Sequence, residues 1–79
     1  MANFDEQKEE ARKLFALLEG KVFADYAMAA YALRAEYDRL HPTGGNFGRL
    51  LALGAAASFF DDAPGGRIVI NTHKVIRAN

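Results

Sequence analysis

The chain has 79 residues, which is enough for one small domain, residues 1–79, with a modest hydrophobic core. It contains no cysteine and two histidines, which excludes disulfides, thiolate zinc sites and histidine-rich metal sites. Ten basic and ten acidic residues cancel, so no overall field would draw the chain toward nucleic acid or an anionic membrane.

Two features of the sequence bear on where the protein works. The first residues lack the basic and apolar blocks of a secretory signal. The longest uncharged stretch, residues 50–60, would extend only about 16 Å as a helix, roughly half of a bilayer core. Because the absence of cysteine also suits a reducing compartment, we expect a cytoplasmic protein without a membrane partner.

Residues 4–19 have the spacing of an amphipathic helix. Their apolar side chains recur at three- and four-residue intervals and so share one face: Phe4, Ala11, Leu14, Phe15 and Leu18. Asn3 stands where an N-cap is expected, with Glu6 three residues later. Gly20 is placed to end the helix, because glycine adopts the left-handed conformation found there.

Residues 22–40 predict a second, longer helix. Its apolar face would consist of side chains at helical spacing: Tyr26, Ala30, Leu33, Tyr37 and Leu40. Six alanines raise its helix propensity. The helix should stop before Pro42, because proline disfavours a helical conformation in the residue that precedes it.

Residues 46–60 predict a third helix, with Asn46 as its cap. Its other polar side chains are Arg49 and Ser58, so the helix is apolar almost all round and is expected in the middle of a bundle or at a subunit interface. Gly48 and Gly54 weaken it by about 1 kcal/mol each relative to alanine. Close packing against a neighbouring segment would offset that loss.

The end of the chain has the composition of a β-structure. Pro64-Gly65 suits a type II turn, and residues 67–76 are rich in isoleucine and valine. These residues predict either a hairpin turning at residues 71–72 or one strand, which would pair with another chain. The expected fold class is therefore α+β, mainly α, with three helices followed by a hairpin or a strand.

No constellation of catalytic or metal-binding residues can be assembled from the sequence. Asp38 and His41 are three residues apart, but two ligands do not make a metal site. No serine or threonine has a recognisable base and orienting acid. The glycine-rich segment 43–49 could hold a phosphate or carboxylate, yet it lacks a phosphate-loop fingerprint and favours a plain connection. We therefore expect no enzymatic activity, no metal and no cofactor.

Binding to a macromolecular partner is the remaining class of function. Exposed tyrosine beside arginine is common in protein interfaces, and Tyr31, Arg34 and Asp38 would form such a strip on the second helix. The alternative is an ordinary solvated helix face, because most surface residues bind nothing. Basic residues elsewhere could also contact a partner. The candidate partner-binding residues are Tyr31, Arg34, Asp38, Arg49, Arg67, Lys74 and Arg77.

Two partners compete in this interpretation. The leading hypothesis is a protein-binding module, such as a stoichiometric inhibitor or adaptor of the phage or mobile-element kind that blocks a host CRISPR or restriction complex. The alternative is a winged-helix DNA-binding regulator, because three helices and a hairpin follow that element order. The third helix, however, offers few side chains that could read bases. A homodimer could form through the third helix or the C-terminal strand.

Overall fold

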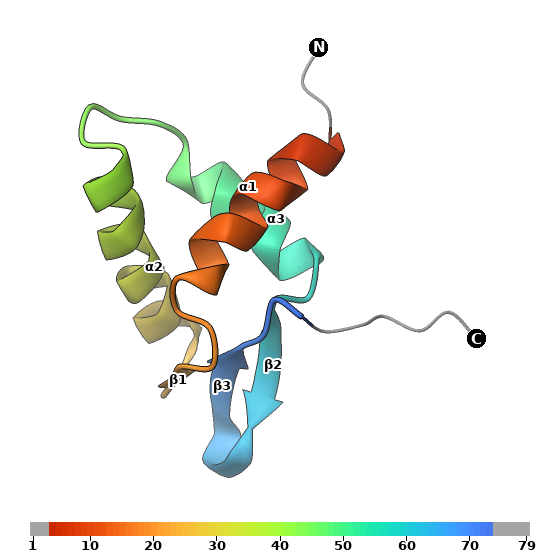
Figure 1. The fold of residues 1–79 in the computed structure, drawn as a ribbon. Helices are drawn as coiled ribbons and strands as arrows, with labels where there is room; N and C mark the ends of the chain where they lie inside the picture. Colours follow the sequence, from red (N-terminus) through yellow and green to blue (C-terminus); the bar gives the residue numbers. More distant parts are fainter. Residues whose placement is uncertain (1–3, 74–79) are drawn as a thin grey trace.

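The computed structural model describes residues 4–73, which form three helices and a small sheet (Figure 1). In chain order the elements are α1 (Phe4–Ala16), β1 (Val22–Phe23), α2 (Tyr26–Leu40), α3 (Phe47–Ala56), β2 (Phe60–Ala63), a short 3-10 helix (Pro64–Gly66) and β3 (Arg67–Ile70). This arrangement confirms the predicted α+β, mainly α class.

The sheet has three antiparallel strands in the order β1-β3-β2. The central strand is β3, with Val69 opposite Val22 on one side and opposite Asp61 on the other. Because both edges of β3 are paired within the chain, this strand does not need a second molecule to satisfy its backbone.

The hairpin differs from the one expected within residues 67–76. It joins β2 to β3 through Pro64–Gly66, where Gly65 has a φ of 79° and a ψ of 22°, as the third residue of a type II turn requires. The predicted hairpin around residues 71–72 is wrong, because both edges of β3 are already paired with β1 and β2. The Asn71 amide donates to the Phe59 carbonyl at 2.8 Å. Residues 74–76 of the expected hairpin lie outside the described residues.

Helix boundaries also differ from the predicted ones. Residues 22–23 were expected in the second helix but pair with β3, and α2 begins only after Asp25, whose carboxylate accepts the Met28 amide at 2.9 Å. The third helix was expected to reach residue 60 but ends at Ala56. Ser58 then takes a positive φ of 64°, which turns the chain into β2. The cap predicted at Asn46 is confirmed by a 3.1 Å bond from the Arg49 amide.

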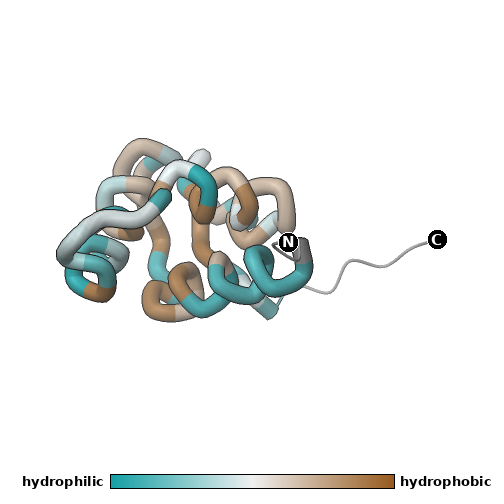
Figure 2. Tube along the Cα trace, turned by 90° about the horizontal axis from the view of Figure 1, so that it is seen from above, coloured by the Kyte–Doolittle hydropathy of each residue, from teal (hydrophilic) through white to brown (hydrophobic). Residues whose placement is uncertain are grey.

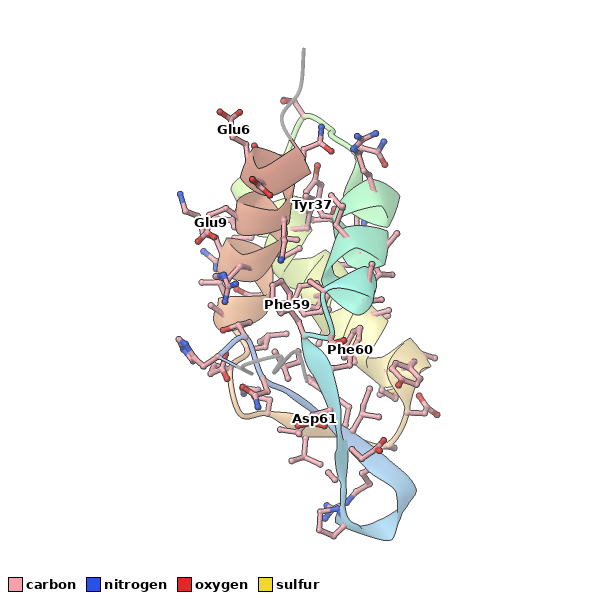
Figure 3. The ribbon with its side chains drawn as sticks, turned by 90° about the vertical axis from the view of Figure 1, so that its right-hand side faces the viewer. Glu6, Glu9, Tyr37, Phe59, Phe60 and Asp61 are labelled. Atoms are coloured by element: carbon pink, nitrogen blue, oxygen red, sulfur yellow. The ribbon has the colours of Figure 1, made fainter. Side chains whose placement is uncertain are left out.

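The hydrophobic core is centred on Phe15, a fully buried residue of α1. Its ring lies 5.7 Å from that of Phe59 and 5.0 Å from that of Phe60, between centroids (Figure 3). Gly54 of α3 lies directly against the same ring. Seen from above, the hydrophobic segments turn toward the space between the helices and the strands, while much of α1 is hydrophilic on its outer side (Figure 2).

The third helix is less enclosed than its apolar sequence predicts. One side of α3 packs on α1, but Ala52 and Ala55 remain exposed. The second helix stands to one side of the crossed pair α1 and α3 (Figure 1). The apolar face predicted for α2 is therefore buried only in part: Leu33 and Tyr37 are in the core, whereas Tyr26 and Leu40 are about half exposed.

A polar network fastens the end of β3 to the end of α1. Thr72 is buried, and its hydroxyl donates to Glu19 Oε1 at 2.5 Å while its amide donates to the same oxygen at 3.0 Å. The Arg12 guanidinium donates to the Thr72 carbonyl and lies over the Phe59 ring. Partial burial would raise the pKa of the Glu19 carboxyl, but the two hydrogen bonds from Thr72, with His73 nearby, lower this pKa below its ordinary value.

Replacing Thr72 by valine should destabilise the protein by about 1–2 kcal/mol at neutral pH, because Glu19 then loses its hydroxyl donor. A carboxyl whose pKa is lowered by folding stabilises the fold above its unfolded pKa of about 4.3, and loses this effect as the pH falls through the lower folded value. The difference between wild type and Thr72→Val in urea unfolding should therefore shrink from about pH 6 to about pH 3. Thr43→Val, in an exposed loop, serves as the control. A pH-independent difference would contradict this account.

Candidate partner-binding surface

A strip of exposed side chains runs along the outer face of α2. Tyr31 is 77% exposed, more than the other large apolar side chains that the structure leaves exposed. Arg34 follows three residues later and forms an ion pair with Asp38, with 3.0 Å between Arg34 Nε and Asp38 Oδ1. Their helical spacing places the three side chains on one face. We call Tyr31, Arg34 and Asp38 the α2 strip.

The guanidinium of Arg34 is also held from α3. Its central carbon lies 5.3 Å from the centroid of the Phe47 ring, in the position of a cation–π contact. Arg34 and Asp38 have side chains that are each 58% exposed, so both remain accessible. The strip is therefore oriented by an ion pair within α2 and by an aromatic ring from α3. Sequence reasoning missed Phe47, because its contact with Arg34 depends on how α3 packs beside α2.

Two apolar grooves flank α2. One, of about 380 Å³, lies between α1, α2 and the start of α3, and Leu14, Leu17, Leu40 and Leu50 supply most of its apolar wall. The other, of about 350 Å³, lies between α2, α3 and β2, and it is lined by Tyr26, Ala27, Ala30, Leu51, Ala55 and Phe60. Sequence reasoning assigned several of these residues to the core. Tyr26 and Leu40 are about half exposed in these grooves, whereas Leu14 also belongs to the core.

The predicted basic contacts do not join the α2 strip. Arg49 binds Gln7, with 3.1 Å between Arg49 Nε and the Gln7 side-chain oxygen, so it links α3 to α1. Arg67 is exposed beside the hairpin turn and donates from Nε to the Pro64 carbonyl at 2.8 Å. The hairpin and the start of α3 lie at opposite ends of the fold (Figure 1). The candidates Lys74 and Arg77 lie outside the described residues.

A smaller, more polar pocket of about 210 Å³ lies where α2 ends and α3 begins. Arg34 and Asp38 are part of its lining, so the pocket adjoins the α2 strip. The residues that line the pocket are Arg34, Tyr37, Asp38, His41, Pro42, Gly44, Gly45 and Phe47. Sequence reasoning singled out the glycine-rich segment but placed Arg49 beside it. In the structure Arg34 takes that position, because Arg49 points to Gln7.

Within residues 4–73, no group of three histidine or acidic side chains is arranged to hold a metal ion. None of the helices in this part of the chain is both long and apolar enough to cross a membrane. Comparison of the sequence with protein-family models and with curated proteins, and of the structure with solved structures, finds no match in any of the three.

Proposed function

We propose that the protein is a non-enzymatic, cytoplasmic binding module that attaches to another protein through the α2 strip. The observation that carries this proposal is Tyr31, which is 77% exposed on α2 beside an arginine oriented by an aromatic ring. Tyrosine and arginine are the residue types that most often dominate the binding energy of an interface. A stoichiometric inhibitor or adaptor, of the kind that phages use against host defence complexes, would fit these properties.

The orientation of Arg34 supports the same proposal. Immobilising a long side chain on binding costs about 0.5–1.5 kcal/mol of conformational entropy. Here Arg34 is already restrained by Asp38 and by the Phe47 ring, so part of that loss has occurred before the partner arrives. The apolar grooves on either side of α2 would enlarge the contact area around the strip.

DNA binding is the second candidate, favoured by topology. The element order, with a strand between the first two helices, and the strand order β1-β3-β2 are those of a winged-helix domain. In such a domain α3 would read the major groove, which requires hydrogen-bonding side chains. The exposed positions of α3 carry Arg49, which is held by Gln7, and otherwise only glycine and alanine: Gly48, Ala52, Ala55 and Ala56. The surface therefore favours a protein partner, although the topology agrees with DNA binding.

The proposal predicts that Tyr31→Ala weakens partner binding by about 30-fold or more, the effect of losing about 2 kcal/mol at the centre of an interface. A tagged wild-type chain should recover one protein at a fixed ratio from a lysate, and Tyr31→Ala should not. Arg34→Ala should reduce recovery as well. Its matched control is Arg39→Ala, since Arg39 is 61% exposed on the same helix and also has an ion pair within α2.

The DNA alternative is tested on the same variants. In one outcome the wild-type chain binds random duplex DNA at low salt and releases it steeply as the salt concentration rises. If Arg67→Ala also weakens this DNA binding and Tyr31→Ala does not, the protein-binding proposal is rejected. If the Tyr31→Ala and Arg34→Ala variants both recover the same protein as well as the wild-type chain does, the α2 strip is rejected as the binding surface.

A further inference from the structure

The pocket between the end of α2 and the start of α3 is lined by a tyrosine whose hydroxyl has no hydrogen-bond partner among residues 4–73. Tyr37 is only 6% exposed, and its hydroxyl lies against Gly45, where an added Cβ would stand 1.8 Å from the oxygen. Figure 3 shows its side chain below the loop that joins α2 to α3. The Tyr37 ring belongs to the hydrophobic core, and its hydroxyl, which is not fully shielded from solvent, lies beside Gly45 in the pocket lining.

Other donors line the same pocket. The His41 ring stacks on Tyr37, with 4.5 Å between centroids, and within the described chain it has no hydrogen bond of its own. Gly45 and Phe47 form the wall at the N-terminus of α3, where the helix dipole is positive. Asn46 accepts from the Arg49 amide there, and within the described chain the Phe47 and Gly48 amides have no partner. The glycine at position 45, with a φ of 142°, lets the loop approach Tyr37 this closely.

Arg34 supplies a guanidinium group with free donors. Its Nε is used by Asp38, but its two terminal nitrogens are not bonded within the described residues, and the Phe47 ring holds the guanidinium at the pocket. A guanidinium presents a planar pair of N–H groups that matches the two oxygens of a carboxylate. Asp38 is the acidic group in the lining, and one of its oxygens already accepts from Arg34.

We propose that this pocket binds a single carboxylate, that of an aspartate or glutamate side chain on the protein partner. The inference rests on the proposed function, because Arg34 and Asp38 belong both to the α2 strip and to the pocket. A partner that covers Tyr31 would place an acidic side chain between the Arg34 guanidinium, the Tyr37 hydroxyl and the His41 ring. The volume of about 210 Å³ suits one side chain and not a larger ligand.

The balance of charge in the pocket distinguishes a carboxylate from a phosphate. Arg34 and Asp38 together contribute no net charge, so the positive contribution comes from the α3 dipole, equivalent to about half an elementary charge. This compensates one negative charge better than the nearly two charges of a phosphate at neutral pH. Because Asp38 offsets the charge of Arg34 but leaves its two terminal nitrogens as donors, the site favours a monovalent anion.

Small probes test the pocket without the partner. We expect N-acetyl-glutamate N-methylamide to shift the Gly44, Gly45 and Phe47 amide signals saturably in nitrogen–proton correlation spectra, with a dissociation constant of about 1–10 mM. The matched probe N-acetyl-glutamine N-methylamide, which has the same shape without the charge, should bind about tenfold more weakly. Equal affinity for the two probes, tighter binding of inorganic phosphate, or shifts located away from these residues would overturn the inference.

Paired variants assign the donors. Arg34→Gln should weaken binding of the glutamate probe about tenfold, whereas Arg39→Gln, outside the pocket on the same helix, should leave it unchanged. Tyr37→Phe should weaken it about fivefold, and Tyr31→Phe should not change it. Each of these four variants keeps a side chain of similar size, and its spectrum shows whether it remains folded. An unchanged affinity in both Arg34→Gln and Tyr37→Phe would overturn the inference.

The failure of this inference differs from the failure of the proposed function. In one outcome Tyr31→Ala weakens partner binding, Tyr37→Phe leaves the partner's affinity unchanged, and the glutamate probe does not bind. The carboxylate site is then rejected, and the α2 strip stands. If the probe binds but no protein is captured through Tyr31, the proposed function is rejected, together with the partner as the source of the carboxylate.

Discussion

Replacing Gly54 by alanine is expected to destabilise the protein by about 1–2 kcal/mol, which reverses the usual effect of this substitution in a helix. An added Cβ would stand 2.3 Å from two atoms of the Phe15 ring. Phe15 is fully buried between α3 and the aromatic rings of residues 59 and 60, so its ring cannot move aside without disturbing the core. At so short a separation the strain of overpacking should reach the upper part of its range of about 1–3 kcal/mol, and it therefore exceeds the gain of about 1 kcal/mol in helix propensity.

Gly48 provides the matched control in the same helix. A Cβ at Gly48 would meet nothing closer than Asn46 Oδ1 at 3.9 Å, which is an ordinary contact. Gly48→Ala should thus stabilise the protein by about 0.5–1 kcal/mol in urea unfolding, while Gly54→Ala destabilises it. A double variant with Phe15→Leu should relieve part of the Gly54→Ala penalty, because the two sites touch. Stabilisation by Gly54→Ala would contradict the packing of α3 on α1.

Phe15→Ala is expected to remove about 3–5 kcal/mol of stability, the largest effect of any single substitution considered. The Phe15 ring contacts residues of α3 and β2, so its loss would leave a cavity where α1, α3 and the sheet meet. A chain of 79 residues has only about 4–12 kcal/mol of stability in total. A large fraction of the variant should therefore be unfolded at room temperature.

The measurement is the fraction folded, taken from circular dichroism and from the dispersion of the proton spectrum. Leu17→Ala, in the turn that directly follows α1, is the control, since this leucine is about half exposed and its truncation should cost about 1 kcal/mol. A Phe15→Ala variant as stable as Leu17→Ala would show that Phe15 is not the centre of the core.

Local signals in the sequence predicted the helices, the Asn46 cap and the glycine turns. The Asn46 carboxamide caps α3 and Gly65 turns the hairpin, because both properties depend on backbone geometry within a few residues. The ion pair between Arg34 and Asp38 follows from the four-residue spacing on a helix. Each of these contacts is settled by neighbours in the chain, and sequence spacing is sufficient to find it.

Non-local pairing could not be predicted in the same way. The sequence pattern around Val22 and Phe23 predicted the start of a helix. They form a strand because they pair with one edge of β3, which lies more than forty residues later in the chain. Phe60 was likewise predicted at the end of a helix, but it belongs to β2 because it pairs with Ile70 of β3. The contact of Arg34 with Phe47 depends on the angle between α2 and α3, which the apolar pattern of either helix leaves open.

The affinity of the captured partner for the wild-type chain and for Tyr31→Ala tests the central claim most directly. This claim is that the protein works by binding another protein through the α2 strip. Titration calorimetry with the purified partner should show equimolar binding that weakens by about 30-fold or more in Tyr31→Ala and stays unchanged in Arg39→Ala. Equal affinities for the wild-type chain and Tyr31→Ala would contradict the account.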